Sequence, residues 1–386
     1  MADSRSVLIV NMGSSSLKWV VLDATTEQVL QDGDAHWQST TGGRHAEELT
    51  TALSRVRRVD AVGHRVVHGG LRFREGVLID DAVRQEIDRL ATLAPLHNPA
   101  ALAGIDAVSA RFPDLPQVAA FDTAFHRDMP ESAATYPLPW DWTTRWQLRR
   151  FGFHGLSVSY ATERAEAMLG HVPDRLVVCH LGAGCSVSAV QRGRSIATSM
   201  GFTPLEGLMM VQRSGSIDPG LLLYLLTQQG LQPADLDKAL NADSGLLGVS
   251  GVSANMRDVL TAAAAGNQRA QLARDMFVHR LVATIGGMVA LLNGLDALVF
   301  TAGIGERSPQ IRELTCTALQ YLGLVLDPVV NSTGAPDANI ARSDSTVQVL
   351  LIAAREDLAV LRQVTRVLGW PPPQSPAWQP RQGSQG

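Results

Sequence analysis

The feature that most constrains the fold is an apolar run, a turn of mostly small or polar residues and a second apolar run, repeated in the chain. The first copy covers residues 7–22 and turns at 11–16, and the second covers 176–190 and turns at 182–186. Each copy is typical of a β-hairpin. A related strand, followed by a glycine-containing turn, covers residues 297–306. The repetition predicts a duplicated fold with a cleft between its halves.

Helical patterns alternate with strand patterns along the rest of the chain. Short buried strands are predicted at 62–67 and 118–121, the second followed by Asp122. Apolar residues recur at helical spacing over 44–58, 81–93, 157–169, 219–229, 267–293 and 309–322. This alternation predicts an α/β protein. With 386 residues, the chain exceeds the roughly 250–300 residues at which single cores stop growing, so we expect two domains.

Composition narrows the class of protein and its partners. The net charge of −4 gives no electrostatic footprint for nucleic acid or an anionic membrane. No apolar run approaches the ~20 residues of a membrane span, and the N-terminus has no secretory pattern. The three cysteines show neither metal-ligand spacing nor an even disulfide set, so we expect reduced thiols in a cytoplasmic protein. The Pro- and Gln-rich tail from Pro371 is expected to be disordered or bound to the surface.

The three turns of small residues are the first candidates for chemistry. The sequence contains neither G-x-x-x-x-G-K-[ST] nor G-x-G-x-x-G, the usual phosphate-binding signatures. Small residues nevertheless let backbone N–H groups approach phosphate oxygens closely. A single turn of this kind is usually structural, whereas three in one chain, one followed by Lys18, leave phosphate binding and a structural role as equal alternatives.

Long motifs decide between these alternatives. They are NMGSSSLK (11–18), GHRVVHGG (63–70), LAPLHNP (93–99), FDTAFHRDMP (121–130), RRFGFHG (149–155), TSMGFTPLEGLMM (198–210), RSGSIDPG (213–220), SGLLGVSGVS (244–253) and FTAGIGE (300–306). In this order, and over nearly the whole chain, they resemble the signatures of the acetate kinase family. The resemblance implies the duplicated acetate and sugar kinase/actin-like (ribonuclease H-like) fold. It divides the chain into a first domain, 1–123 plus 358–386, and a second domain, 124–357.

The resemblance also implies an activity. Members of the family transfer phosphate reversibly from ATP to acetate, giving acetyl phosphate and ADP, with Mg²⁺ as cofactor and Mn²⁺ as its substitute. We therefore expect a cytoplasmic homodimer without nucleic-acid or membrane partners. Propionate is an alternative acceptor, because one methylene is worth only ~1–3 kcal/mol of discrimination.

The family's transfer residues map onto individual positions of this sequence. The catalytic residues implied are Asp122, His154 and Arg213, with Arg65 on the substrate carboxylate. Two arginines around one phosphoryl group would neutralise its oxygens. From the sequence alone, Asp122 is equally well a helix N-cap or a catalytic group. Because a carboxylate substrate is already ionised near neutral pH, we expect Asp122 to position Mg²⁺ or the acceptor rather than to remove a proton.

The remaining site residues follow from the same motifs. The acceptor and its methyl group are expected to contact Arg65, Val67, Leu96, Phe153 and Pro204. The nucleotide is expected to contact Ser14, Ser16, Lys18, His180, Leu181, Gly182, Ala183, Gly184, Asn255, Met256, Arg257, Gly303, Ile304, Gly305, Glu306 and Arg307. Asn11 and Glu356 are the expected metal-site residues. Outside a motif, most of these residues would be assigned to turns, cores or surface ion pairs.

The departures from the family pattern concentrate on the nucleotide side. Ala183 and Asn255 stand where the family usually has Asn and Asp, Ser216 replaces an Asp, and Arg307 replaces an Asn. We therefore expect weaker ATP binding or a different phosphoryl donor. A non-catalytic nucleotide-binding relative is the alternative of a different class, and a butyrate or sugar kinase on the same fold is a further one. The intact transfer residues favour the kinase.

Overall fold

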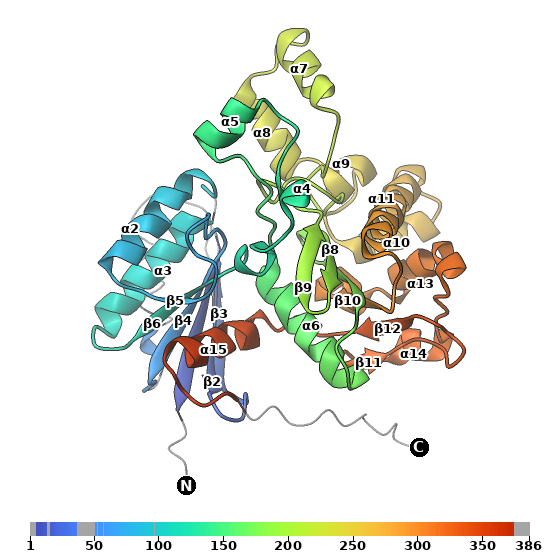
Figure 1. Cartoon of the computed structure of the whole chain (residues 1–386). Helices are drawn as coiled ribbons and strands as arrows, with labels where there is room; N and C mark the ends of the chain where they lie inside the picture. The colour runs from blue at the N-terminus through green and yellow to red at the C-terminus, as the bar shows by residue number, and fades with distance from the viewer. Residues whose placement is uncertain are drawn as a thin grey trace. The chain divides into compact units, whose positions relative to one another are not determined.

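The computed structural model describes residues 5–13, 16–36, 51, 53–56, 58–95 and 97–373 (Figure 1). The chain forms two compact units. One contains Met1–Arg127, Phe153–Tyr160 and Arg355–Gly386, and the other contains Asp128–Gly152 and Ala161–Ala354. The division expected from the sequence placed 124–127, 153–160 and 355–357 in the second domain, whereas these segments pack with the first unit. The domain bounds of the sequence analysis remain a prediction.

The first unit is built on a six-stranded sheet of order β3-β2-β1-β4-β6-β5. The strands are β1 (Ser6–Met12), β2 (Ser16–Asp23), β3 (Val29–His36), β4 (Ala61–Val66), β5 (Val77–Leu78) and β6 (Gln117–Phe121). β1, β2 and β3 pair antiparallel, β4 and β6 continue the sheet in parallel with β1, and β5 closes the edge antiparallel. The polar ends of β1, β4 and β6 therefore meet at one edge.

Helices cover both faces of this sheet. They are α2 (Asp81–Arg89), η1 (Leu90–Thr92), α3 (Asn98–Arg111), η2 (Ala124–His126) and α15 (Glu356–Val367). A Cβ on Gly104 of α3 would touch Met12, whereas a Cβ on Gly63 of β4 would touch Val360 of α15. Met12 and Gly63 belong to opposite faces because side chains alternate along a strand.

The second unit repeats this topology with a sheet of order β11-β12-β10-β7-β8-β9. Its strands are β7 (Arg175–Leu181), β8 (Cys185–Gln191), β9 (Arg194–Thr198), β10 (Ala297–Thr301), β11 (Ala338–Asn339) and β12 (Gln348–Leu351). Again three antiparallel strands are followed by two parallel strands and an antiparallel edge strand. The duplication predicted from the repeated hairpin is confirmed.

The second unit carries most of the helices. They are α4 (Glu131–Ala134), α5 (Trp140–Trp146), α6 (Gly155–Leu169), α7 (Pro219–Thr227), α8 (Pro233–Ala242), α9 (Gly245–Ser250), α10 (Met256–Ala264), α11 (Gln268–Leu292), α12 (Ala302–Arg307), α13 (Pro309–Ala318), η3 (Gln320–Leu322) and α14 (Pro328–Thr333). α6 begins in the first unit and ends in the second.

α11 is long and apolar enough to cross a membrane by length and composition alone. Its Phe277, Leu281 and Ile285 are buried, and the helix packs against β7 and β8 (Figure 1). This arrangement is typical of the core helix of a globular domain.

Most of the predicted elements are confirmed, and one is wrong. The turn predicted after the strand at 297–300 is instead the helix α12. Ala302 takes a left-handed φ of 64° at its start, and the chain then continues helically through Gly303 and Gly305. The predicted helix at 44–58 lies largely outside the described residues, as does the tail from residue 374.

Candidate active site

Arg65, at the end of β4, is the centre of a polar cluster in the first unit. Its Nη2 donates to Asp122 Oδ2 at 2.6 Å and its Nε to Asp122 Oδ1 at 3.2 Å. Nε also lies 3.2 Å from Glu356 Oε2, and Nη1 donates to Asn11 Oδ1 at 3.2 Å. Asn11 is in β1, Asp122 directly follows β6 and Glu356 begins α15. Three strand ends and one helix start thus bring together four residues that the sequence assigned to the site.

Arg65 keeps its charge although the cluster is largely buried. Asp122 is only 1% exposed. Burial works against the charge on Arg65, but the neighbouring carboxylates of Asp122 and Glu356 outweigh it and raise the pKa of the guanidinium. Two carboxylates around one guanidinium leave an excess negative charge. Such a cluster is suited to a further cation.

The same oxygens are a suitable donor set for Mg²⁺. Mg²⁺ takes oxygen ligands, uses one or two carboxylates and keeps several waters or substrate phosphates. Asp122 and Glu356 offer carboxylates and Asn11 offers an amide oxygen, all within reach of one guanidinium. In the part of the chain that the structure describes, no group of three or more His, Cys, Asp or Glu side chains that could hold a metal ion is found. The fit to Mg²⁺ rests on the three oxygen donors of Asn11, Asp122 and Glu356.

His154 lies in a strained turn that is fixed to Asp122. Gly152 and His154 have left-handed φ angles of 73° and 59°, and a positive φ is uncommon outside glycine. Gly155 N donates to Asp122 O at 2.8 Å, and Phe153 O lies 3.1 Å from His126 Nε2. Strained conformations of this kind persist where the surrounding contacts determine them, often at functional sites.

Part of the predicted acceptor pocket is present in the same unit. Phe153 is 1% exposed, and its ring meets His68 edge-on at a centroid distance of 5.6 Å. Val67 directly precedes His68 and is half-buried. Leu96 lies outside the described residues. Pro204 belongs to the second unit, where its carbonyl accepts from Arg213 Nη1 at 3.2 Å.

Arg213 is a half-buried cation in the second unit. Burial lowers the pKa of its guanidinium. Among the residues that the structure describes, no carboxylate forms an ion pair with it. Cys185 lies nearby at the start of β8, and burial raises the pKa of its thiol to about 12, so the thiol stays neutral. A half-buried guanidinium without a carboxylate is suited to an anionic ligand.

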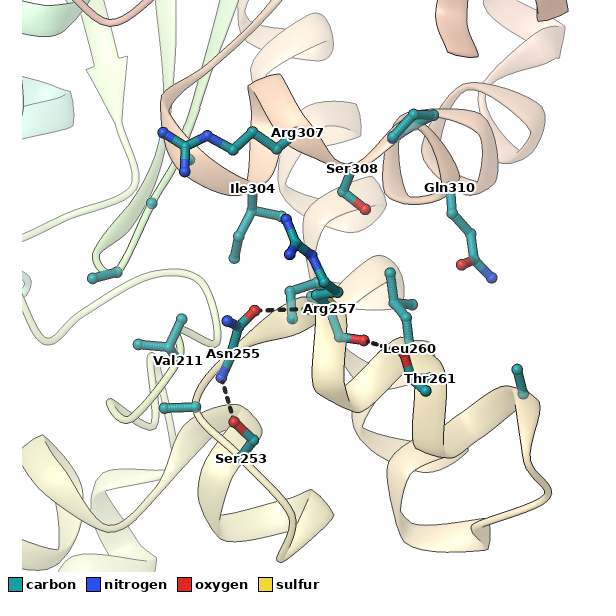
Figure 2. Close-up of a pocket in the computed structure, with 17 residues that line it drawn as sticks. Val211, Ser253, Asn255, Arg257, Leu260, Thr261, Ile304, Arg307, Ser308 and Gln310 are labelled. Atoms are coloured by element: carbon teal, nitrogen blue, oxygen red, sulfur yellow. Dashed lines mark hydrogen bonds between the residues drawn. The ribbon is translucent and has the colours of Figure 1, made fainter. Parts of the chain in front are cut away.

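The second unit also contains a cavity of about 910 Å³ beside α10 and α12 (Figure 2). Predicted nucleotide residues that line it are Gly182, Ala183, Asn255, Met256, Arg257, Gly303, Ile304 and Arg307. Lining residues that the sequence analysis missed are Val211, Ser253, Ala254, Leu260, Thr261, Ala264, Ser308, Pro309 and Gln310. Of these, Ala254 and Ser308 directly adjoin a predicted residue in the sequence, and for those two that proximity was the available signal.

The cavity combines an apolar wall with cations. Asn255 caps α10 by accepting from Arg257 N at 2.9 Å, and Asn255 N donates to Ser253 Oγ at 3.0 Å. Figure 2 shows the Arg257 side chain extending from the start of α10 toward Ile304. Of the described residues, the charged side chains that line the cavity are Arg257 and Arg307. An apolar cavity with two cations suits an aromatic ring attached to an anion.

Several predicted nucleotide residues adjoin the cavity without lining it. Leu181 ends β7, and Gly182 N donates to Gly184 O at 2.9 Å to close the hairpin turn. His180 is 7% exposed. Glu306 Oε1 accepts from Ala354 N at 2.8 Å, so its carboxylate holds the chain after β12. Gly305, in α12, is buried.

The first hairpin supplies the remaining predicted contacts. Lys18 pairs with Asn11 across β1 and β2, and directly opposite residues share one face of a sheet. Lys18 is exposed, on the face that also carries Asn11. Ser16 begins β2, and its carbonyl accepts from Gly13 N at 2.7 Å. Ser14 lies outside the described residues.

Comparisons with known proteins identify relatives of this chain. A model of the acetokinase family matches residues 44–362. An acetate kinase of Trichormus variabilis is 45% identical over 94% of this chain and 99% of its own length. The crystal structure of Porphyromonas gingivalis acetate kinase gives a TM-score of 0.88 at 35% identity, over 95% of this chain and 100% of its own. The crystal structure of a propionate kinase from Francisella tularensis gives a TM-score of 0.86 at 37% identity, over 93% of this chain and 98% of its own. These structures confirm the expected acetate and sugar kinase/actin-like fold.

Proposed function

The chain belongs to the acetokinase family, and on that premise we propose that it transfers the γ-phosphoryl group of ATP reversibly to acetate, giving acetyl phosphate and ADP. The observation that carries the proposal is the cluster in which Arg65 contacts Asp122, Glu356 and Asn11. A carboxylate acceptor needs a fixed cation of this kind, because a guanidinium matches carboxylate geometry. The cation-lined cavity supports a nucleotide as the donor.

The reaction needs no general base. Acetate is ionised near neutral pH, so a carboxylate oxygen attacks the γ-phosphorus directly. The new P–O bond forms as the bond from phosphorus to the β,γ-bridging oxygen breaks, and its electron pair leaves with ADP. Arg65 orients the acetate, and Asp122 holds Arg65 in place. In the first unit, Val67 and Phe153 are the proposed contacts of the methyl group.

Charge stabilisation comes from groups that donate to the transferring phosphoryl. Its three peripheral oxygens carry the charge of a loose transition state. Arg213 and His154 are each suited to donate a hydrogen bond to such an oxygen. Asn11, Asp122 and Glu356 would hold Mg²⁺, or Mn²⁺ in its place, and the bound ion supplies neutralisation of the phosphate charge.

The nucleotide occupies the cavity beside α10 and α12. Ile304 and Leu260 contact the base, and the amide of Asn255 takes the place of a carboxylate beside the ribose. Gly182 and Ala183 approach the phosphates from the hairpin tip. Ser14, Ser16 and Lys18 stay the phosphate contacts that the sequence predicts in the first hairpin. Because Asn255 and Arg307 replace the usual Asp and Asn, we expect ATP to bind more weakly than in the family's usual pattern.

Propionate is the second acceptor that an observation favours. The similarity to the Francisella tularensis propionate kinase is as close as that to the Porphyromonas gingivalis acetate kinase. A pocket wall of Val67 and Phe153 contains no polar side chain that would exclude a further methylene.

Homodimerisation and a cytoplasmic location complete the proposal. The second unit exposes large apolar side chains, including Trp140 at 70%, Leu223 at 63% and Trp146 at 51%. Exposed apolar residues of this size often mark an interface between subunits. The three cysteines are buried free thiols, which suits a reducing compartment.

The test is acyl phosphate formation trapped with hydroxylamine, using ATP, Mg²⁺ and either acetate or propionate. Wild-type protein is expected to give the hydroxamate, and Arg213→Ala to lose it by at least about 10³-fold, in line with cationic groups in phosphoryl transfer. Arg192→Ala is the matched control, because Arg192 is an exposed arginine paired with Asp174. If the wild-type protein forms no hydroxamate with acetate and none with propionate, the proposal is overturned and a non-catalytic nucleotide-binding relative is favoured.

A further inference from the structure

A buried polar cluster lies directly behind the wall of the nucleotide cavity. Arg312 of α13 is 1% exposed. Its Nη1 donates to Gly305 O at 2.8 Å and to Glu306 O at 2.9 Å, the last carbonyls of α12. Its Nε donates to Asn331 Oδ1 at 2.8 Å, and its Nη2 to Asn331 O at 2.5 Å. Asn331 Nδ2 in turn donates to Pro309 O at 3.1 Å.

This guanidinium is bonded to carbonyl oxygens alone. Within the described ranges, no carboxylate forms an ion pair with Arg312. Burial lowers the pKa of its guanidinium, although arginine stays protonated. A buried charge is costly unless every donor finds an acceptor. The carbonyls at a helix C-terminus carry partial negative charge and supply that compensation here.

The backbone that Arg312 and Asn331 hold is the backbone that shapes the cavity. The fixed carbonyls belong to Gly305, Glu306 and Pro309. Their neighbours along the chain, Ile304, Arg307, Ser308 and Gln310, line the cavity together with Pro309 itself. The end of α12 and the start of α13 therefore have their positions set by Arg312 and Asn331, neither of which lines the cavity.

On the premise that this cavity binds the nucleotide as proposed above, we propose that Arg312, with Asn331, is a positioning residue for nucleotide binding. It touches no substrate. It holds the α12–α13 corner so that Ile304 and Arg307 keep their places around the ligand. Lysine keeps the charge, but its compact ammonium lacks the planar fork with which the guanidinium bonds the carbonyls of α12 and Asn331 together.

The test is Arg312→Lys, measured by steady-state kinetics and by direct binding of a fluorescent N-methylanthraniloyl ATP. We expect KM for ATP and the Kd of the probe each to rise at least about fivefold, whereas kcat changes less than about twofold and KM for acetate stays unchanged. This split identifies lost ground-state binding of one substrate. Arg342→Lys is the matched control, since Arg342 is an exposed arginine of the same unit paired with Asp344.

A purely structural role would give a different result. It would lower the melting temperature and the active fraction without changing KM for ATP, and that outcome overturns the inference. If Arg312→Lys does not fold, Asn331→Ala decides, because it removes the Nε acceptor and the Pro309 contact and is expected to raise the probe Kd about threefold. Wild-type protein that binds the probe but makes no acyl phosphate would refute the proposed reaction while the binding comparison still tests Arg312.

Discussion

Replacing Gly155 by alanine should disable the acceptor site while leaving the nucleotide cavity intact. A Cβ at this position would lie 2.2 Å from Asp122 O and 3.0 Å from Phe125 Cβ. A backbone oxygen cannot rotate away, so the two segments must separate by about 1 Å to restore an ordinary contact. The separation breaks the bond from Gly155 N to Asp122 O and displaces His154 or Asp122.

The size of this displacement sets the expected loss of activity. A misplacement of about 1 Å costs on the order of 10²-fold in rate, which is roughly 2.7 kcal/mol of barrier. We expect kcat/KM for acetate to fall by that factor in the hydroxamate assay, with the Kd of the fluorescent ATP analogue unchanged. The unchanged Kd follows because the cavity belongs to the other unit.

Gly287→Ala is the matched control for this experiment. Gly287 lies within α11, and a Cβ there would meet nothing within 4 Å. Alanine should stabilise an exposed helix position by about 1 kcal/mol relative to glycine, so thermal unfolding should rise slightly while activity stays at the wild-type value. A folded Gly155→Ala protein with kcat/KM within threefold of wild type would refute the reasoning.

Three further predictions concern pH, the donor and the thiols. Burial lowers the pKa of His64, His68 and His126 to about 4. Below the unfolded histidine pKa of 6.5, the unfolded chain therefore takes up protons that the folded protein does not bind. The stability that these histidines contribute is present above pH 6.5 and is lost as the pH falls toward 4. His64→Gln should make the fall in unfolding free energy between pH 7 and 4.5 smaller by roughly 2 kcal/mol in denaturant titrations, and an unchanged fall would contradict the assignment. Asn255→Asp should lower KM for ATP about threefold, as expected if a carboxylate accepts better from ribose hydroxyls; a higher KM would argue against ribose at this position. Burial raises the pKa of the Cys185 thiol to about 12, so iodoacetamide at pH 7.5 should label it only after unfolding, as mass spectrometry would show.

Local patterns were sufficient to predict the two hairpins, because strand alternation and turn residues are encoded within a few positions. The third turn was predicted wrongly for the same reason. Gly303 and Gly305 are typical of turns, but they lie in α12, where the left-handed φ of Ala302 makes the bend before the helix begins. Glycine content alone does not distinguish a turn from the start of a helix.

The residues of the polar cluster around Arg65 were predicted from the sequence, but their contacts with one another were not. Arg65 and Asp122 are 57 positions apart, and Glu356 comes from the far end of the chain. Their contacts depend on the parallel order of β1, β4 and β6 and on the docking of α15, which no local pattern specifies. Sequence motifs therefore predicted these residues as site residues, but not that Asn11, Asp122 and Glu356 all contact the guanidinium of Arg65.

The cavity wall shows the opposite limit. Leu260 and Val211 line it, yet an apolar residue on a helix face has the same sequence pattern whether it faces a core or a ligand. Arg312 was missed because its partners are three backbone carbonyls, which leave no trace in the side-chain sequence, and one amide side chain 19 positions away. Such residues become visible only when the backbone is placed.

The central claim is that a carboxylate oxygen of acetate attacks the γ-phosphorus of ATP. Its most direct test is ³¹P NMR of the wild-type protein with ATP, Mg²⁺ and acetate labelled with ¹⁸O in both carboxyl oxygens. The account predicts ADP together with acetyl phosphate whose bridging oxygen is ¹⁸O, seen as an upfield isotope shift of the phosphorus resonance. Unlabelled inorganic phosphate as the sole product, or AMP and pyrophosphate in place of ADP, would contradict it.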